Sequence, residues 1–258
     1  MITQTKKFNV RNVIISDNQS YKKFKILNNN KKLKIFSDFN SFNKIFTSKV
    51  DYVMSSIVGI DGLLPTINII KFTKKIAIAN KESIICAWNL IKKELKKNDT
   101  KFIPVDSEHF SIHEIIKNEN PKQIKKIIIT ASGGPFLNKK IKKNISPRDA
   151  ISHPNWAMGK KISIDSATMM NKIFEIIEAK KIFDIELKKF DILIHPKSYI
   201  HAIVKLKNGL IKIIAHDTDM RIPIFNSIYI GSNNIKFIKS KKIDLNILNS
   251  LNLQNVNK

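Results

Sequence analysis

The sequence predicts an α/β fold in which a parallel-sheet unit is followed by an α+β unit. Three observations lead to this prediction. Short, β-branched apolar segments alternate with helix-like segments through the first hundred residues, which is typical of β-α-β units with a parallel sheet. Polar residues follow the ends of two later strand-like segments. Finally, Asn208-Gly209 separates two further apolar runs, and such a pair is a strong signal for an antiparallel hairpin.

The first unit consists of strands and helices in alternation. We expect strands at residues 10–16, 33–36, 52–58 and 75–79, and helices at residues 42–47, 63–72 and 82–97. Asp17-Asn18 predicts a turn after the first strand. The helix at 82–97 ends in a lysine-rich turn, which suits the negative end of its dipole. Right-handed crossovers would then place these strands in a parallel sheet.

The second unit mixes parallel and antiparallel signals. We expect strands at residues 102–105, 126–130 and 190–195, a long amphipathic helix at 165–184, and hairpin strands at 202–206 and 210–215. Residues 231–258 are rich in Asn and Lys and predict no definite element. In open α/β sheets, ligands bind in the loops that follow the carboxyl ends of the strands. Candidate ligand-binding residues are therefore expected in those loops.

Composition excludes several classes of protein. The single cysteine, Cys86, rules out a disulfide framework and a multi-cysteine metal site. No apolar run is long enough to span a bilayer, and the first 12 residues lack the apolar core of a signal peptide. We therefore expect a soluble protein from a reducing compartment, with no membrane partner.

A net charge of +25 is typical of nucleic-acid-binding proteins, but the composition and distribution of the basic residues argue against that function. Arginine, the residue that makes bidentate contacts to bases and phosphates, occurs only at Arg11, Arg148 and Arg221. The lysines are spread along the whole chain, and abundant Lys, Ile and Asn together indicate an A/T-rich coding bias. We therefore expect a solvated basic surface and no nucleic-acid partner.

A first candidate site is Asp106-Ser107-Glu108, which follows a predicted strand. Two carboxylates at i and i+2 offer the hard oxygen ligands that Mg²⁺ or Mn²⁺ prefers. The same three residues are also an ordinary helix start, with Asp106 or Ser107 as the N-cap. The sequence of these three residues is compatible with a metal site and with a helix N-cap.

A second candidate is the polar row of the helix expected at 165–184. Asn171, Lys172, Glu175 and Glu178 are spaced by three or four residues and so share one helix face. This row is either a binding surface for phosphate and metal or a solvated face with an ordinary Lys–Glu pair.

Four shorter segments could also touch a ligand. Residues 153–159 resemble a closing lid, with His153, Trp156 and Gly159, or else a surface loop whose tryptophan packs on the core. Ser132-Gly133-Gly134 could let backbone N–H groups approach an anion, although many turns look alike. Asn80-Lys81-Glu82-Ser83 suits a cofactor contact and a helix cap equally. His195 and His201 are interpreted as structural.

Together and in this order, the segments resemble the 1-deoxy-D-xylulose 5-phosphate reductoisomerase family. The resemblance spans residues 10–240 and rests on eight stretches, which are GLLPT from Gly62, ANKES from Ala79, PVDSEH from Pro104, SGGPF from Ser132, HPNWAMGKKIS from His153, DSATMMNK from Asp165, IHPKS from Ile194 and DMR from Asp219. Eight ordered matches make a chance resemblance negligible.

The resemblance implies a role for each matched residue. Asp106, Glu108 and Glu175 would bind the divalent metal. Glu108, Lys172, Glu175 and His153 would act in catalysis. The substrate would be bound by Ser107, Glu108, Ser132, His153, Trp156, Ser166, Asn171, Lys172 and Glu175, and Met158 would join Trp156 in the lid. NADPH would contact Asn80, Lys81, Glu82 and Gly159.

The resemblance also implies the overall organisation and chemistry. Residues 1–104 would be a partial Rossmann-like, NADPH-binding domain, residues 105–235 a catalytic metal and substrate domain, and residues 236–258 a linker remnant. The family uses NADPH and Mg²⁺ or Mn²⁺ to convert 1-deoxy-D-xylulose 5-phosphate, a sugar phosphate, to 2-C-methyl-D-erythritol 4-phosphate in isoprenoid biosynthesis. Its members form homodimers in the bacterial cytoplasm or in plastids.

Three departures from the family pattern suggest an alternative. The family begins with a strand and a Gly-rich turn that binds NADPH phosphates, and it ends in a helical domain, and neither is found in this sequence. Ile173 and Asp61 stand where the family usually has small residues. The alternative is a catalytically impaired remnant or split-gene fragment that retains only metal and substrate binding.

Overall fold

The structure is a computed structural model, and it describes residues 1–137, 145–152, 159–229, 238 and 254–255. The described strands are β1 (Asn12–Ile14), β2 (Lys34–Phe36), β3 (Val50–Ser55), β4 (Thr73–Ile78), β5 (Lys101–Pro104), β6 (Ile124–Ala131), β7 (Phe190–Ile194), β8 (Ile200–Leu206), β9 (Ile211–Ala215) and β10 (Gln254–Asn255). The described α-helices are α1 (Ile2–Lys7), α2 (Asn18–Leu27), α3 (Phe42–Ile45), α4 (Leu63–Ile69), α5 (Lys81–Lys97), α6 (Ser107–Ile116), α7 (Pro147–Ile151), α8 (Lys160–Ala167), α9 (Met170–Phe183) and α10 (Arg221–Tyr229).

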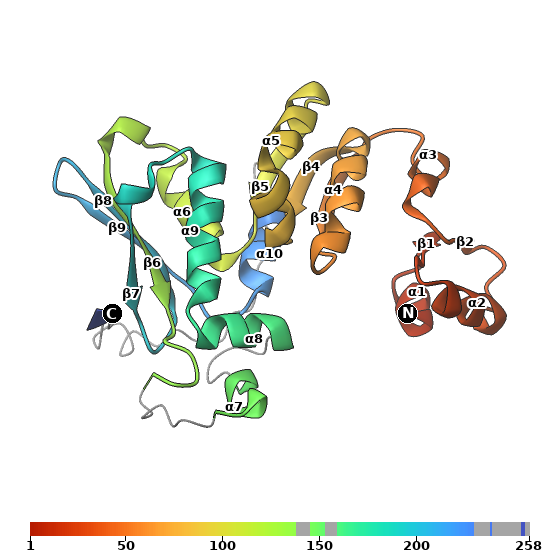
Figure 1. Cartoon of the computed structure of the whole chain (residues 1–258). Coiled ribbons are helices and arrows are strands. Elements are labelled where there is room, and N and C mark those ends of the chain that lie inside the picture. The colour runs from red at the N-terminus through yellow and green to blue at the C-terminus, as the bar shows by residue number, and fades with distance from the viewer. Residues whose placement is uncertain (138–144, 153–158, 230–237, 239–253, 256–258) are drawn as a thin grey trace.

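The strands form three sheets arranged along the molecule (Figure 1). β1 and β2 pair in parallel beside α1 and α2 at the amino-terminal end. β3, β4 and β5 form a second parallel sheet. The third sheet has the order β10-β7-β6-β8-β9, in which only β6 and β7 are parallel. The predicted α/β fold, with a parallel part followed by an α+β part, is therefore confirmed.

The parallel sheet is stabilised by the apolar face of α5. Ile84, Trp88 and Ile91 recur at helical spacing and are buried against β4, whose Ile76 and Ile78 are also buried. Asn80 begins this helix, because its Oδ1 accepts the Ser83 N–H at 2.6 Å. The helix cap that the sequence offered at Asn80 is thus present.

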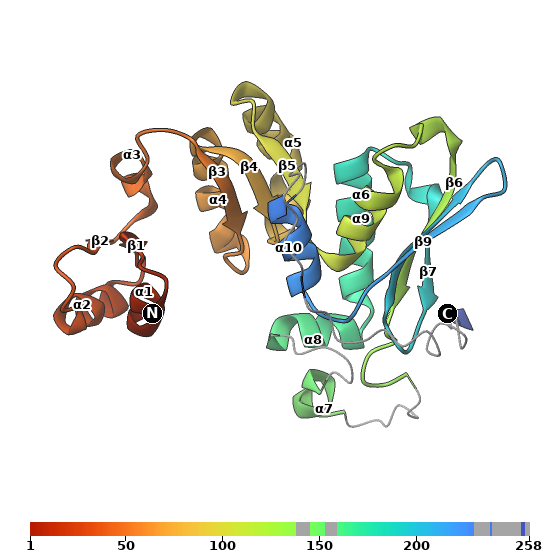
Figure 2. The same cartoon turned by 180° about the vertical axis from the view of Figure 1, so that it is seen from behind.

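Two helices cover one face of the five-stranded sheet. Ile127 and Ile129 of β6 point into a core with Ile112 of α6 and Ala179 of α9, and all four are fully buried. Both views show α6 and α9 on this face, with α10 between this sheet and β3–β5 (Figures 1 and 2). Tyr52 of β3 and Ser227 of α10 join their hydroxyl groups at 2.7 Å across the junction.

The prediction of one long helix at residues 165–184 is wrong in one respect, because the structure has two helices there, α8 and α9. Met169 has a left-handed backbone with φ of 62°, which no α-helix can continue through. Thr168 promotes the break, since its hydroxyl donates to the carbonyls of Ile164 and Asp165 at 3.2 Å. α8 therefore lies across the end of α9 (Figure 1).

Other differences are smaller. The turn expected at Asp17-Asn18 is wrong, because Asp17 is the N-cap of α2 and accepts the Ser20 N–H at 2.8 Å. The hairpin is confirmed, with Gly209 at φ of 90° between β8 and β9. β10, within the tail that predicted no element, pairs with β7. No helix among the described residues is long and apolar enough to cross a membrane.

Candidate metal and phosphate site

A cavity of about 210 Å³ opens where α5, α6, α8 and α9 meet the ends of β4, β5 and β6. The ends of strands β4, β5 and β6 each contribute to its lining, as expected for an α/β sheet. The lining residues are Ala79, Lys81, Asp106, Ser107, Glu108, Thr130, Ser132, Ile162, Ser166, Asn171, Lys172, Glu175, Ser198, His201 and Met220.

Three carboxylates converge in this cavity. Asp106 follows β5, Glu108 lies in the first turn of α6, and Glu175 lies in α9, and one oxygen from each is within 4.8 Å of the others. Glu108 and Glu175 are 7% and 1% exposed. Asp106 occupies the N-cap position of α6 but makes no side-chain cap hydrogen bond. Its carboxylate faces the cavity, so the metal-ligand interpretation describes it better than the cap.

Two buried lysines pair with these carboxylates. Lys172 donates to Glu175 Oε2 at 2.6 Å and also to Glu108. Lys81, the first residue of α5, places its Nζ 3.2 Å from Asp106 Oδ2 and 2.8 Å from Asn171 Oδ1. Both lysines are about nine-tenths buried, so each ammonium depends on these partners to offset the loss of water.

Charge in the cluster does not balance. Around Lys81 and Lys172 lie four carboxylates, those of Asp106, Glu108, Glu175 and Glu178. With all six groups ionised, the cluster therefore carries a formal charge of −2, before the imidazole of His109 is counted. Burial and the neighbouring Glu108 raise the pKa of Glu175 to about 8. Burial likewise raises the pKa of Glu178 to about 8.

Asp106 shows the opposite shift. Its burial opposes ionisation, but the charges of Lys81 and His109 outweigh burial and hold its pKa below the ordinary value. The cluster thus has two carboxylates more than its resident cations can satisfy. Three converging oxygen ligands and a deficit of two positive charges fit Mg²⁺ or Mn²⁺.

Hydroxyl and amide groups line the cavity beside the carboxylates. Ser166 from α8 and Asn171 from α9 reach it from either side of the helix break at Met169. Ser132 follows β6, and its Oγ accepts the Gly134 N–H at 3.3 Å. A Cβ at Gly134 would lie 2.9 Å from Ser166 O, so glycine permits the loop after β6 to approach α8. Ser107 is buried and donates to Glu108.

The residues predicted for the cofactor do not all lie together. Lys81 joins the carboxylate cluster, whereas Glu82 pairs with Lys161 of α8 at 3.2 Å. Asn80 is buried, and its Nδ2 donates to the carbonyls of Ile57 and, at 2.8 Å, Gly59. Gly159 is exposed at the start of α8. The predicted His153, Trp156 and Met158 fall outside the described residues.

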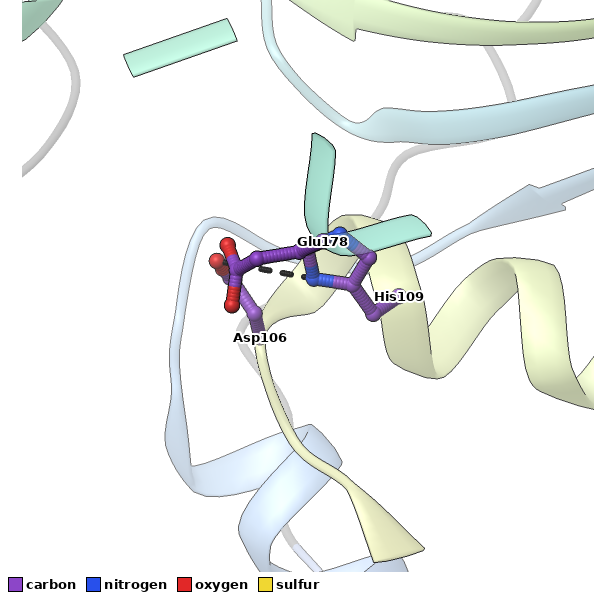
Figure 3. Close-up of side chains that lie close together, drawn as sticks. All are labelled: Asp106, His109 and Glu178. Carbon is purple, nitrogen blue, oxygen red and sulfur yellow. Dashed lines mark ion pairs between the residues drawn. The ribbon is translucent and has the colours of Figure 1, made fainter. Parts of the chain in front are cut away.

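Two buried residues of the site, His109 and His201, had no ligand role in the prediction from sequence. His109 lies three residues after Asp106, with its Nδ1 3.7 Å from Asp106 Oδ2 (Figure 3). That i+3 spacing was a usable signal. Glu178, which the sequence placed in the polar row with Glu175, lies one turn after it and is close to Asp106 and His109. His201, interpreted as structural, lines the cavity and stacks on His216 with ring centroids 3.7 Å apart. Burial lowers the pKa of His201 to about 4.

Comparison with family models matches both parts of the chain. The model described as 1-deoxy-D-xylulose 5-phosphate reductoisomerase matches residues 1–88. The model described as the 1-deoxy-D-xylulose 5-phosphate reductoisomerase C-terminal domain matches residues 102–183. The second match contains the three converging carboxylates.

Similar proteins carry the same name. A 1-deoxy-D-xylulose 5-phosphate reductoisomerase from Pelagibacter ubique is 61% identical over 99% of this chain and 66% of its own length. One from Wolbachia pipientis is 43% identical over 97% of this chain and 64% of its own length. The chain thus spans slightly less than two thirds of the length of these relatives.

The fold of this chain is also similar to that of solved structures. The reductoisomerase from Zymomonas mobilis in complex with NADPH has a TM-score of 0.86 and 32% identity, over 99% of this chain and 66% of that one. A reductoisomerase in complex with NADPH, fosmidomycin and magnesium has a TM-score of 0.85 and 34% identity, over 98% and 65% of the two chains. From its sequence, its fold and its carboxylate cluster, this chain belongs to the 1-deoxy-D-xylulose 5-phosphate reductoisomerase family.

Proposed function

We propose that this chain carries the catalytic segment of an NADPH-dependent reductoisomerase that converts 1-deoxy-D-xylulose 5-phosphate to 2-C-methyl-D-erythritol 4-phosphate. The observation that carries the proposal is the buried cluster of Asp106, Glu108 and Glu175, whose unbalanced charge suits a divalent cation. Hydroxyl and amide groups beside it suit a phosphorylated sugar. Relatives bound to NADPH and magnesium support both cofactors.

The proposed roles follow from where each side chain lies. Asp106, Glu108 and Glu175 would hold the metal, which would act as a Lewis acid on substrate oxygens while a carbon–carbon bond breaks and re-forms. Lys172, fixed by Glu108 and Glu175, would stabilise negative charge on a substrate oxygen next to the carboxylates.

The remaining roles concern binding. Ser132, Ser166 and Asn171 would hold the phosphate, from the loop after β6 and from both sides of the α8–α9 break. Ser107 would fix the orientation of Glu108. NADPH would approach the end of the β3–β5 sheet, near Asn80, Lys81, Glu82 and Gly159, and would supply the hydride. His153 and Trp156 keep their predicted roles beside the substrate.

We also propose the organisation that the family suggests. Residues 1–104 would bind the cofactor, residues 105–235 would bind metal and substrate, and residues 236–258 would be a linker. Two copies would associate as a homodimer in a bacterial cytoplasm. Support for self-association comes from β9, an edge strand that exposes the apolar side chains of Ile211 and Ile213.

Catalysis is tested by the loss of NADPH absorbance with 1-deoxy-D-xylulose 5-phosphate and Mg²⁺. We expect turnover that Glu175→Gln abolishes, because the amide removes a ligand charge while keeping its shape. A folded chain without turnover at high NADPH would refute autonomous catalysis. If substrate still raised the melting temperature in a metal-dependent way without turnover, the alternative of a chain that only binds metal and substrate would hold.

A further inference from the structure

Glu178 is a buried carboxylate with an incomplete set of partners. It lies in α9, one turn beyond Glu175, and is 2% exposed. Among the described residues, its Oε2 has no hydrogen-bond partner. Figure 3 shows its carboxylate beside Asp106, next to the ring of His109. Buried carboxylates normally accept hydrogen bonds from charged donors, so this free oxygen requires an explanation.

A lysine near this oxygen is already engaged elsewhere. Lys81 Nζ lies 3.9 Å from Glu178 Oε2, which is beyond hydrogen-bond distance. The ammonium instead bonds Asp106 at 3.2 Å and lies 3.8 Å from Glu175 Oε1. Lys81 thus stands between Glu178 and two of the three proposed metal ligands.

A divalent ion on Asp106, Glu108 and Glu175 would conflict with this position of Lys81. The ion and the ammonium would share Asp106 in a buried site, where like charges repel strongly because water does not screen them. A movement of Nζ by about 1 Å would bring it within hydrogen-bond distance of Glu178 Oε2. His109 cannot accompany this movement, since its Nε2 is held by the Glu175 carbonyl at 2.8 Å.

We propose that Lys81 is a displaceable internal counter-cation, which neutralises Asp106 in the metal-free cluster and moves onto Glu178 Oε2 when the divalent ion binds. Glu178 is then a positioning residue that receives the lysine and does not touch the metal. This inference rests on the proposed metal site at Asp106, Glu108 and Glu175. Because Lys81 begins α5, metal occupancy would also change the contacts at the amino-terminal end of that helix.

The test is a double-mutant cycle on Mn²⁺ affinity, measured by electron paramagnetic resonance on the full chain. In the chain that retains Lys81, Glu178→Gln should weaken Mn²⁺ binding by roughly tenfold, because the displaced ammonium then meets a neutral amide oxygen in place of a carboxylate and its charge is left uncompensated. In the Lys81→Met background the same change should weaken binding by less than about twofold, since no ammonium needs an acceptor. Equal losses of Mn²⁺ affinity in both backgrounds would overturn the proposal. Glu178 would then act on the metal only through its negative charge.

The matched control is the ion pair between Glu114 of α6 and Lys117, the C-cap residue of that helix, whose charged atoms lie 2.6 Å apart outside the cluster. Lys117→Met and Glu114→Gln, alone and together, should leave Mn²⁺ affinity unchanged. If the unaltered chain binds no Mn²⁺, or if Glu175→Gln binds it equally well, the proposed metal site itself fails. These outcomes are distinct from equal losses in the cycle.

A structure of the unaltered chain with Mn²⁺ tests the same proposal without any substitution. We expect Lys81 Nζ within hydrogen-bond distance of Glu178 Oε2 and no longer bonded to Asp106. A metal-bound structure in which Lys81 still bonds Asp106 would overturn the proposal, even if a Glu178 variant failed to fold.

Discussion

Single buried side chains connect distant parts of this chain. Asn80 uses its carbonyl oxygen to begin α5 and its amide to hold the loop after β3, through Ile57 and Gly59. Gly62 packs against it so closely that a Cβ there would lie 2.9 Å from Asn80 Nδ2. Asn80 therefore organises the edge of the proposed cofactor site whether or not it touches NADPH.

Replacing Asn80 should cost much of the stability of this region. Asn80→Ala removes an N-cap and two further hydrogen bonds, those of its Nδ2 to the carbonyls of Ile57 and Gly59, so we expect a loss of about 2–4 kcal/mol in the free energy of unfolding. Urea denaturation measures it. The control is Asn120→Ala, at a cap on an exposed turn, where less than about 1 kcal/mol is expected. A similar small effect at both positions would show that the Asn80 amide bonds contribute little.

Glu175 predicts an unusual dependence of stability on pH. Its pKa is raised to about 8 in the fold, mainly by burial, so the folded state disfavours its ionised form. The stability that protonated Glu175 contributes to the fold is fully present below the ordinary carboxyl pKa. It is lost as the pH rises from there toward 8. The metal-free chain should therefore lose stability over this range relative to Glu175→Gln.

Urea denaturation with a chelator, at a series of pH values, measures this difference. Adding Mg²⁺ should remove it, because the ion favours the ionised carboxylate and its binding releases protons. Asp106 contributes in the opposite sense at low pH, since its pKa is lowered and its stabilisation is lost on protonation. Parallel pH profiles for the unaltered chain and Glu175→Gln would contradict the expectation.

At the scale of elements, the break between α8 and α9 shapes the substrate pocket. One continuous helix would place Ser166 and Asn171 on a single rod, whereas the break lets both line the same cavity. Met169 makes the break with a left-handed backbone that is unfavourable for any residue with a Cβ. The sequence offered no glycine here, so the break was not predicted.

The strain at Met169 predicts substitutions of opposite sign. Met169→Gly should stabilise the chain by about 0.5–1 kcal/mol, because glycine adopts positive φ without a steric penalty. Met170→Gly, one residue later and inside α9, should destabilise it by a similar amount. Urea denaturation measures the free energy of unfolding of the two variants. A loss of stability at both positions would show that the Met169 side chain stabilises the fold by more than its left-handed backbone destabilises it.

At the scale of the whole molecule, the exposed surface bears on assembly. Among the described strands, β9 is the last of the mixed sheet, and it carries Ile211 and Ile213 at 56% and 45% exposure. Edge strands with exposed apolar residues pair readily with another chain unless they are protected. The scattered lysines that produce the charge of +25 keep the remaining surface solvated.

The proposed homodimer can be tested at this edge. Ile213→Lys should shift the chain from dimer to monomer in analytical ultracentrifugation, because it places a charge on the strand that would pair. Leu187→Lys, which replaces a side chain of similar exposure away from the edge, is the control and should leave the dimer intact. Dimers that persist with Ile213→Lys would exclude β9 from the interface.

The sequence by itself determined the order of strands β1 to β9, helix α5, the hairpin at Gly209 and the acidic residues that follow β5. These features depend on residues close together in the chain, where periodicity, caps and turn residues act. The family resemblance assigned Glu175 to the metal and Lys172 to catalysis and substrate binding, and the structure brings both together with Glu108.

Only the tertiary structure decided which charges meet. Lys81, predicted to contact NADPH, enters the carboxylate cluster because α5 packs beside α9, and its partner Asn171 is 90 residues away. Glu178 and His109 join the cluster for the same reason. The energy of a buried charge depends on every neighbour within a few ångströms, and sequence spacing does not reveal neighbours from other elements.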